Sequence, residues 1–164
     1  MAVDVFKRES IGGDEYYTLR QHVEDIADQL FIQPNTLIWC PFDTDDSMFP
    51  IVLRERGYKV VNTSSDFFTT DMPDGCGAII SNPPFSIKKE ILNRIMELNV
   101  PFALLLPFLW MNDGVPFDYG SQIILWRKRV FFNTPEGVKN KPRATCFALS
   151  NGLFRYDYKL YHDR

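Results

Sequence analysis

The sequence is poor in cysteine and histidine, which limits the kinds of site it can form. The three cysteines, Cys40, Cys76 and Cys146, are odd in number, widely spaced and without a Cys-x-x-Cys pair. This spacing argues against a disulfide framework and favours reduced thiols in a cytoplasmic protein. The two histidines, His22 and His162, are far apart in the chain, and we interpret both as surface residues.

Long apolar runs and an excess of positive charge are also absent. No run approaches the roughly 18 apolar residues of a membrane-spanning helix, and the start of the chain lacks the apolar core of a signal peptide. We therefore expect neither a membrane span nor a signal peptide. The formal net charge is −3. Because dedicated nucleic-acid-binding proteins are more often basic, any contact with nucleic acid must come from local basic patches.

The length and the aromatic content indicate one globular domain with a large core. A chain of 164 residues is typical of a single domain, and at this size folding buries roughly 68–70% of the unfolded surface. Aromatic residues make up 15% of the chain, and rings in excess of the core can line a pocket for a flat ligand. We predict a flexible segment over residues 1–14 and one domain over residues 15–164.

Apolar periodicity predicts helices and strands that alternate through most of the chain. Val23, Ile26, Ala27, Leu30 and Phe31 fall on one face of a helix over 21–31. The other predicted helices cover 48–57, with Ser47 as its cap, and 86–98. The predicted strands are 36–40, 58–62, 78–81, 101–108, 121–132 and 144–150.

This alternation predicts an α/β fold with a mostly parallel sheet. The last two strands have no helix between them, so we expect them to form an antiparallel C-terminal hairpin. Ligands of such sheets bind outside the carboxyl ends of the strands, near the point where the strand order reverses. The segments Pro-Phe-Asp-Thr-Asp-Asp, residues 41–46, and Asn-Pro-Pro-Phe, residues 82–85, both follow strands. We therefore expect them to border the same crevice.

The segment Asn82-Pro83-Pro84-Phe85 has the chemistry to hold an amino group on a flat conjugated ring. The side chain of Asn82 and the peptide carbonyl of Pro83 are two acceptors, and the prolines fix their separation. A ring stacked on Phe85 would present its exocyclic amine to both acceptors. This draws the nitrogen out of conjugation, so that a weak nucleophile can attack a methyl sulfonium without a general base. The alternative is that the tetrapeptide is only a rigid loop.

With these residues in place, the sequence resembles the S-adenosylmethionine-dependent amino-methyltransferases of the N6-adenine type, and in particular small phage-type proteins. Residues 82–85 match their Asn-Pro-Pro-Phe motif in full. The resemblance implies that Asp66 accepts a hydrogen bond from the cofactor adenine and that Phe67 packs on its ring. Tyr17 and Thr18 resemble an N-terminal cofactor motif. Residues 129–133 resemble a late motif, in which Phe131 or Phe132 would stack on a flipped base.

The resemblance implies a Rossmann-like methyltransferase fold, with a mostly parallel doubly wound sheet and an antiparallel C-terminal hairpin. One motif departs from the family pattern, which is Asp-Pro-Phe followed by a glycine-rich turn. Here Cys40-Pro41-Phe42-Asp43 stands at that cofactor-binding position, and carboxylates replace the glycines. The acidic residue expected after the second strand, which would bind the cofactor ribose, is missing. An acidic loop would attract the ammonium and sulfonium groups of the cofactor and repel its carboxylate.

A basic cluster is the predicted contact with nucleic acid, and DNA is preferred to RNA. It consists of Arg127, Lys128, Arg129, Lys139, Lys141 and Arg143. These side chains would bind phosphates beside the crevice, and a duplex adenine would have to leave the base stack. The chain has no room for a separate target-recognition domain. Either sequence selectivity is weak or a protein partner supplies recognition.

Two further alternatives stay open at this point. Asp43, Asp45 and Asp46 have the oxygen ligands of a divalent-cation site, although acidic turns more often precede a helix as solvated caps; we expect no metal. The altered first motif also leaves open a catalytically inactive methyltransferase-like protein with a binding or anti-defence role. Retention of all four residues of the turn favours the active enzyme.

Overall fold

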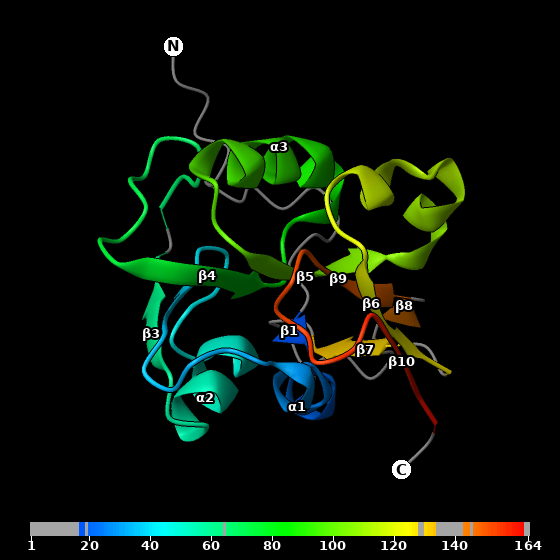
Figure 1. Ribbon diagram of the computed structural model, residues 1–164, viewed down its shortest axis with the longest axis horizontal. Helices are drawn as coiled ribbons and strands as arrows, with labels where there is room; N and C mark the ends of the chain where they lie inside the picture. Colours follow the sequence, from blue (N-terminus) through cyan, green and yellow to red (C-terminus); the bar gives the residue numbers. More distant parts are fainter. Residues whose placement is uncertain are drawn as a thin grey trace.

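A computed structural model describes residues 17–18, 20–63, 65–127, 130–133, 143–144 and 146–162. Its main feature is a seven-stranded sheet in the order β10-β6-β9-β5-β4-β2-β3 (Figure 1). The strands are β2 (Leu37–Cys40), β3 (Lys59–Asn62), β4 (Cys76–Ser81), β5 (Phe102–Pro107), β6 (Gln122–Trp126), β9 (Cys146–Ser150) and β10 (Tyr158–Tyr161). The segment predicted to be flexible, residues 1–14, lies outside the described residues.

The sheet is mostly parallel, as the alternation of helices and strands predicts. β3, β2, β4 and β5 pair in parallel, and so do β6 and β10. Of the seven strands described, β9 runs antiparallel to its neighbours, β5 and β6. The predicted fold class, an α/β sheet with antiparallel pairing near the C-terminus, is confirmed.

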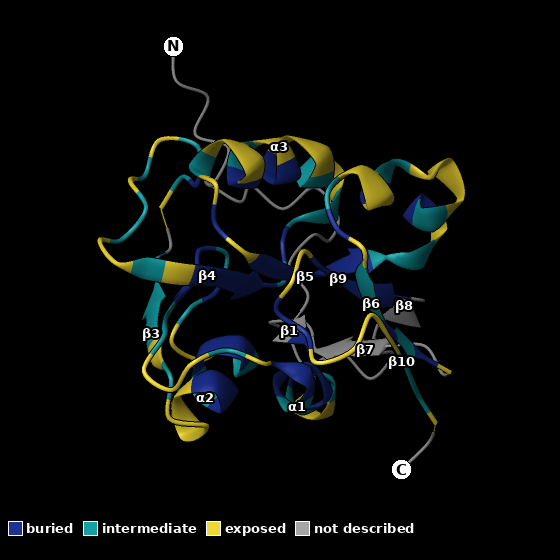
Figure 2. Ribbon diagram, viewed as in Figure 1, coloured by how far each residue is buried: buried dark blue, intermediate teal, exposed yellow. Residues whose placement is uncertain are grey.

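Helices cover both faces of this sheet. In Figure 1, α1 (Arg20–Gln29) and α2 (Met48–Glu55) lie on one side, and α3 (Lys88–Leu98) lies on the other. Two 3-10 helices, η2 (Phe108–Asp113) and η3 (Val115–Asp118), follow β5 where the sequence suggests an irregular loop. The covered strands are buried, whereas the outer faces of the helices are exposed (Figure 2).

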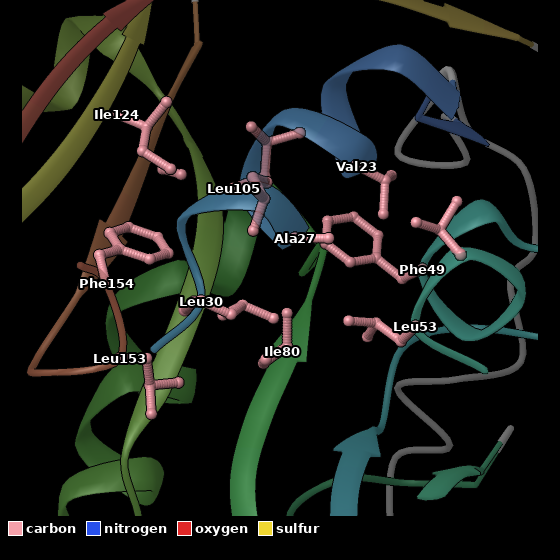
Figure 3. Close-up of a cluster of buried hydrophobic side chains, with 14 of the residues drawn as sticks. Val23, Ala27, Leu30, Phe49, Leu53, Ile80, Leu105, Ile124, Leu153 and Phe154 are labelled. Atoms are coloured by element: carbon pink, nitrogen blue, oxygen red, sulfur yellow. The ribbon is translucent and has the colours of Figure 1, made fainter. Parts of the chain in front are cut away.

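Successive residues of the central strands serve two separate cores. Ile38 and Ile80 belong to the core under α1 and α2, whereas Trp39 and its neighbour Ile79 belong to the core under α3. This is the two-residue alternation of a strand that is buried on both faces. Figure 3 shows Ala27 of α1 and Leu53 of α2 directed toward the sheet residues of the first core.

Helix α1 ends two residues earlier than the periodicity predicts. Leu30 leaves the helix and pairs with Phe154, and the amide of Phe31 donates to the carbonyl of Leu153 at 2.8 Å. This extended path turns Phe31 away from the core, and 70% of the residue is exposed. The prediction of an inward Phe31 is therefore wrong, because the helical period stops at Gln29.

Helices α2 and α3 form where the sequence predicts them. α2 is followed by Gly57 at φ +88°, a conformation that favours glycine. α3 starts after a 3-10 turn, η1 (Phe85–Ile87), and ends at Asn99 in the left-handed region. Its buried residues are Ile91, Leu92 and Ile95.

The predicted strand over 121–132 is instead two strands in different sheets. β6 belongs to the large sheet, whereas β7 (Val130–Asn133) pairs with β1 (Tyr17–Thr18) and β8 (Arg143–Ala144) in a small one. A strand of that predicted length would extend about 40 Å, far beyond its four- to six-residue neighbours. β10, which the sequence analysis does not predict, adds an edge to the large sheet.

His22 is not the surface residue that we expected. It is half-buried on α1 and meets the ring of Trp126 edge-on, with 5.4 Å between ring centroids. Burial lowers the pKa of His22 to about 4, so the imidazole is neutral at physiological pH. His162, by contrast, is exposed.

No helix among the described residues combines the length and apolar character needed to cross a membrane.

Candidate active site

The candidate site lies at the carboxyl ends of β2 and β4, which are neighbours in the sheet. From β2 the chain passes to β3 on one side, and then returns to β4 on the other. The strand order therefore reverses between β2 and β4, which is where parallel sheets bind ligands. Residues 41–47 connect β2 to α2, and residues 82–84 connect β4 to η1 and α3. We call these the β2 loop and the β4 turn.

The β4 turn is a short, well-supported connection. Asn82 is half-buried, and its side-chain oxygen Oδ1 is shielded from solvent. Pro83 is buried, and Pro84 at φ −58° leads directly into η1. Lys88 of α3 donates from Nζ to the carbonyl oxygen of Phe85 at 3.1 Å. The turn is thus fixed by two proline rings on one side and by the first turn of a helix on the other.

Phe85 is partly exposed, and its buried part packs against the core under α1 and α2. In the sequence, Phe85 comes after the buried Ile80 and lies beyond the end of β4. The stacking of Phe85 on a base stays a prediction.

The β2 loop holds its shape through its own hydrogen bonds rather than through glycine. The amide of Asp43 donates to the carbonyl of Cys40 at 3.4 Å. The amide of Thr44 donates to Ser47 Oγ at 3.0 Å, and the amide of Ser47 donates to the carbonyl of Thr44 at 3.0 Å. No residue of this loop has a positive φ. Because no left-handed residue is required, the loop does not need the glycines of the family motif.

Ser47 occupies the N-cap position of α2, as predicted, but its side chain makes no bond to the helix amides. Its hydroxyl oxygen instead contacts Thr44 of the β2 loop, where it accepts from the amide and lies within hydrogen-bond distance of the hydroxyl. Ser47 therefore has the predicted N-cap position, but its side chain does not make the hydrogen bond to the helix amides that a capping side chain would make. The hydroxyl secures the entry to the helix rather than its first turn.

The three carboxylates of the β2 loop have different surroundings. Asp43 is 6% exposed, and one of its carboxylate oxygens accepts a short hydrogen bond from Ser81 Oγ at the end of β4. Asp45 and Asp46 are exposed, and Asp45 lies 3.6 Å from Arg54. In the described part of the chain no three His, Cys, Asp or Glu residues gather as metal ligands. The loop therefore presents one buried carboxylate and two solvated ones.

The hydrogen bond between Ser81 and Asp43 joins the β2 loop to the β4 turn. Sequence reasoning missed Ser81, which directly precedes Asn82. Ser81 could be recognised as a polar residue that directly continues the apolar run 78–80. It is fully buried in the structure. Sequence reasoning also missed Lys88, whose ammonium lies 5.2 Å from the ring centroid of Trp110 as well as near the turn.

Cys40 and Pro41 support the site from within the core. Both are buried, and Cys40 is not exposed at all. Burial, with a smaller contribution from the charge of Asp43, raises the pKa of the Cys40 thiol well above its usual value. The thiol is therefore neutral and packs in the core. Cys76 and Cys146 are also free thiols.

The two residues predicted to bind the cofactor adenine have roles within the protein. The carboxylate of Asp66 accepts from the amide of Phe68 at 2.8 Å and so closes a local turn. Phe67 is 1% exposed, with its ring 5.0 Å from Phe42 and 5.4 Å from Trp39. Phe42 is the most accessible of these three tilted rings. An adenine at this position would meet Phe42 before it meets Phe67.

The structure brings the N-terminal motif next to the late motif. In the small sheet, Tyr17 pairs with Asn133, and Thr18 pairs with Phe132. Thr18 is 4% exposed, and its Oγ1 has no hydrogen-bond partner among the residues described. Segments more than 100 residues apart in the sequence are thus neighbours, and one of them carries a buried hydroxyl.

Part of the predicted nucleic-acid surface lies outside the described residues, namely Lys128, Arg129, Lys139 and Lys141. The backbone of Arg143 in β8 pairs with that of Phe131 in β7. Arg127 is exposed at the end of β6. The small sheet therefore carries one basic residue and the late aromatic pair on adjacent strands.

Comparisons with known proteins support the fold. No family model and no curated protein matches the chain. Among solved structures, the chain is similar to the crystal structure of the 23S rRNA methyltransferase ErmE, with a TM-score of 0.50 and 14% sequence identity. The match covers 87% of this chain and 72% of that chain. At this identity the likeness concerns the fold alone, and it shows that this chain has a Rossmann-like methyltransferase fold.

Proposed function

We propose that this protein transfers a methyl group from S-adenosylmethionine to the exocyclic amino group of adenine in nucleic acid. The observation that carries the proposal is the position of the β4 turn. Residues Asn82–Phe85 match the amino-methyltransferase motif and stand where the strand order of a methyltransferase fold reverses. Its position at the switch point of the sheet favours a ligand-binding turn over a rigid loop alone.

In this proposal the residues of the turn hold the target amine. Asn82 Oδ1 and the carbonyl oxygen of Pro83 accept its two hydrogens, and Phe85 stacks on the base. The lone pair of the nitrogen is then directed away from both acceptors. Since the two acceptors are fixed by Pro83, Pro84 and the bond from Lys88, the turn contributes mainly orientation.

The residues around the β2 loop fit the chemistry of S-adenosylmethionine. The cofactor supplies an electrophilic methyl group on a cationic sulfur. The buried carboxylate of Asp43 suits a positive group, and the ring of Phe42 suits an adenine. The buried Thr18 hydroxyl, which has no hydrogen-bond partner in the described part of the chain, suits a polar group of the cofactor. We assign these three residues, with Tyr17, Cys40, Pro41, Asp66 and Phe67 around them, to the cofactor side of the crevice.

The substrate side of the crevice is assigned to the small sheet. Phe131 and Phe132 of β7 would stack on the flipped base, while Arg129, Lys139, Lys141 and Arg143 would bind phosphates. DNA is our first choice of substrate. RNA is the natural comparison, because ErmE, whose fold is similar, is a 23S rRNA methyltransferase.

Methyl transfer from S-adenosylmethionine with a deuterated methyl group tests the proposal. The protein is incubated with single- and double-stranded DNA and RNA, and the digested nucleosides are identified by mass spectrometry. We expect label on N6-methyl-2′-deoxyadenosine. Matched oligonucleotides with inosine in place of adenosine, which lack the amino group, should take up no label. Label on cytosine alone, or on no nucleoside of any substrate, would overturn the proposal.

A further inference from the structure

We propose that Asp43, held by Ser81, selects the positively charged methyl donor over the neutral product, S-adenosylhomocysteine. This inference rests on the proposed function, because it concerns the same crevice. It goes further by assigning the discrimination between substrate and product cofactor to one carboxylate. The family motif has no carboxylate at the corresponding position, whereas the β2 loop has Asp43 there.

The carboxylate of Asp43 is anchored next to the β4 turn. Asp43 is hydrogen-bonded to Ser81 Oγ, and Ser81 is joined by one peptide bond to Asn82. If Asn82 holds the target amine, the methyl group must be presented within reach of that amine. The cationic sulfur that carries the methyl group therefore lies on the side of the crevice where Asp43 is anchored.

Asp43 exerts its field from a buried position, since it is 6% exposed and Cys40, whose carbonyl accepts from the Asp43 amide, is not exposed. Charges interact several times more strongly in such an environment than in water. After burial, which is the larger cause, the charge of Asp43 also contributes to the raised pKa of the Cys40 thiol.

Asp43 differs from the other acids of the β2 loop in its exposure to solvent. Asp45 and Asp46 are exposed, and Asp45 is close to Arg54. Water and the guanidinium screen these charges. They neither attract the sulfonium strongly nor repel the methionine carboxylate strongly. Discrimination by charge thus belongs to the buried acid.

The two cofactor forms differ in the charge that this carboxylate would sense. S-adenosylmethionine carries a sulfonium, whereas S-adenosylhomocysteine carries a neutral thioether, and both carry the same ammonium and carboxylate. Sinefungin has an ammonium near the position of the sulfonium. A carboxylate that faces the sulfur position should favour S-adenosylmethionine and sinefungin over S-adenosylhomocysteine. A carboxylate that faces the amino acid end should not distinguish among them.

Calorimetric titration of the full chain with these three ligands tests the inference. We compare the wild type with Asp43→Asn, which is isosteric, and with Asp45→Asn as the exposed control. In Asp43→Asn, the affinities for S-adenosylmethionine and sinefungin should fall about tenfold, and that for S-adenosylhomocysteine by less than about threefold. Asp45→Asn should leave all three affinities unchanged.

Ser81→Ala provides a second variant in case Asp43→Asn does not fold, and circular dichroism of each variant establishes its folding. Without the hydroxyl the carboxylate loses its fixed position, so the preference for the charged ligands should fall in the same direction by a smaller factor. Equal losses for all three ligands, or an unchanged preference in both variants, would overturn the inference and leave the proposed function intact. Failure of the wild type to bind any of the three ligands would overturn the proposed function itself.

Discussion

The β4 turn and the β2 loop lie side by side at one edge of the sheet, yet they relate to the methyltransferase pattern in opposite ways. The turn keeps all four residues of its motif, whereas the loop keeps only Pro41 and Phe42 and has no glycine. The hydrogen bond from Ser81 to Asp43 joins the two connections. In the proposed function, the two connections are parts of a single site.

The difference shows which features of each connection are chemically constrained. In the turn, two acceptors must keep a fixed separation. An asparagine followed by two prolines meets this requirement, and few other combinations of residues would. In the loop, the chain must pass from β2 to α2 within seven residues, and internal hydrogen bonds can replace left-handed glycines. The predictions below test this division, in which the turn serves the reaction and the loop serves the cofactor.

The largest effect is expected for Asn82→Ala, which removes one acceptor of the target amine. Turnover should fall about 10²- to 10³-fold, the usual consequence of losing one oriented partner in a site. The affinity for S-adenosylmethionine should change little, because that ligand is assigned to the other connection. Initial rates of label transfer and a binding titration measure the two quantities.

Asn93→Ala is the matched control for this variant. Asn93 is an exposed residue of α3 whose side chain accepts from Tyr119 outside the crevice. Its replacement should leave turnover unchanged. If Asn82→Ala and Asn93→Ala had the same activity as the wild type, the turn would have no part in the reaction.

A second prediction concerns the thiols beneath the two connections. Cys40 at the end of β2 is fully buried, whereas Cys76 at the start of β4 is partly exposed. Burial raises the pKa of both thiols, and that of Cys146 to about 12. Iodoacetamide at pH 8 should modify Cys76 roughly ten times faster than Cys40 or Cys146, as followed by peptide mass spectrometry.

In urea the three cysteines should react at similar rates. Rapid modification of Cys40 in the native protein would show that the β2 loop opens readily, which would contradict its description as a closed, hydrogen-bonded loop.

Ser47→Ala tests the replacement of glycine by hydrogen bonds in the β2 loop. The variant removes the acceptor of the Thr44 amide, so the free energy of unfolding should fall by about 1–2 kcal/mol. A thermal melt should show a shift of about 2–5 °C. Ser121→Ala, at an exposed serine before β6, should leave the melt unchanged. Identical melts for the two variants would mean that the loop does not depend on this hydroxyl.

The smallest effect is expected for the exposed acids of the β2 loop. Asp45→Asn and Asp46→Asn should each change the affinity for S-adenosylmethionine by less than about twofold, because solvated charges contribute little. Calorimetry at low and high salt measures this. A large loss in either variant would move the cofactor-facing charge from Asp43 to the surface of the loop.

The sequence predicts the central part of the fold well, because the physical constraint there is local. Apolar runs such as 78–80 and the periodicity of 86–98 require no knowledge of distant contacts, and a strand and a helix form there. The meeting of the β2 loop and the β4 turn at the carboxyl ends of neighbouring strands follows from the same alternation. The resemblance of the turn to a known motif then points to the chemistry of the site.

The incorrect or missing predictions concern residues whose structure depends on contacts with distant segments of the chain. Phe31 fits the helical period, but pairing with the C-terminal segment draws the chain out of the helix. The break between β6 and β7 depends on a partner strand, β1, which lies more than 100 residues earlier. Ser81 acquires its significance only when Asp43, 38 residues away, is seen to be its neighbour.

Binding of S-adenosylmethionine to the wild type and to Asn82→Ala, measured by calorimetry, tests the central claim most directly. The account predicts micromolar binding to both proteins with closely similar affinities, because the altered β2 loop receives the cofactor and the β4 turn receives the base. Absence of binding to the folded wild type would contradict it, and would leave the Asn-Pro-Pro-Phe turn without a methyl donor.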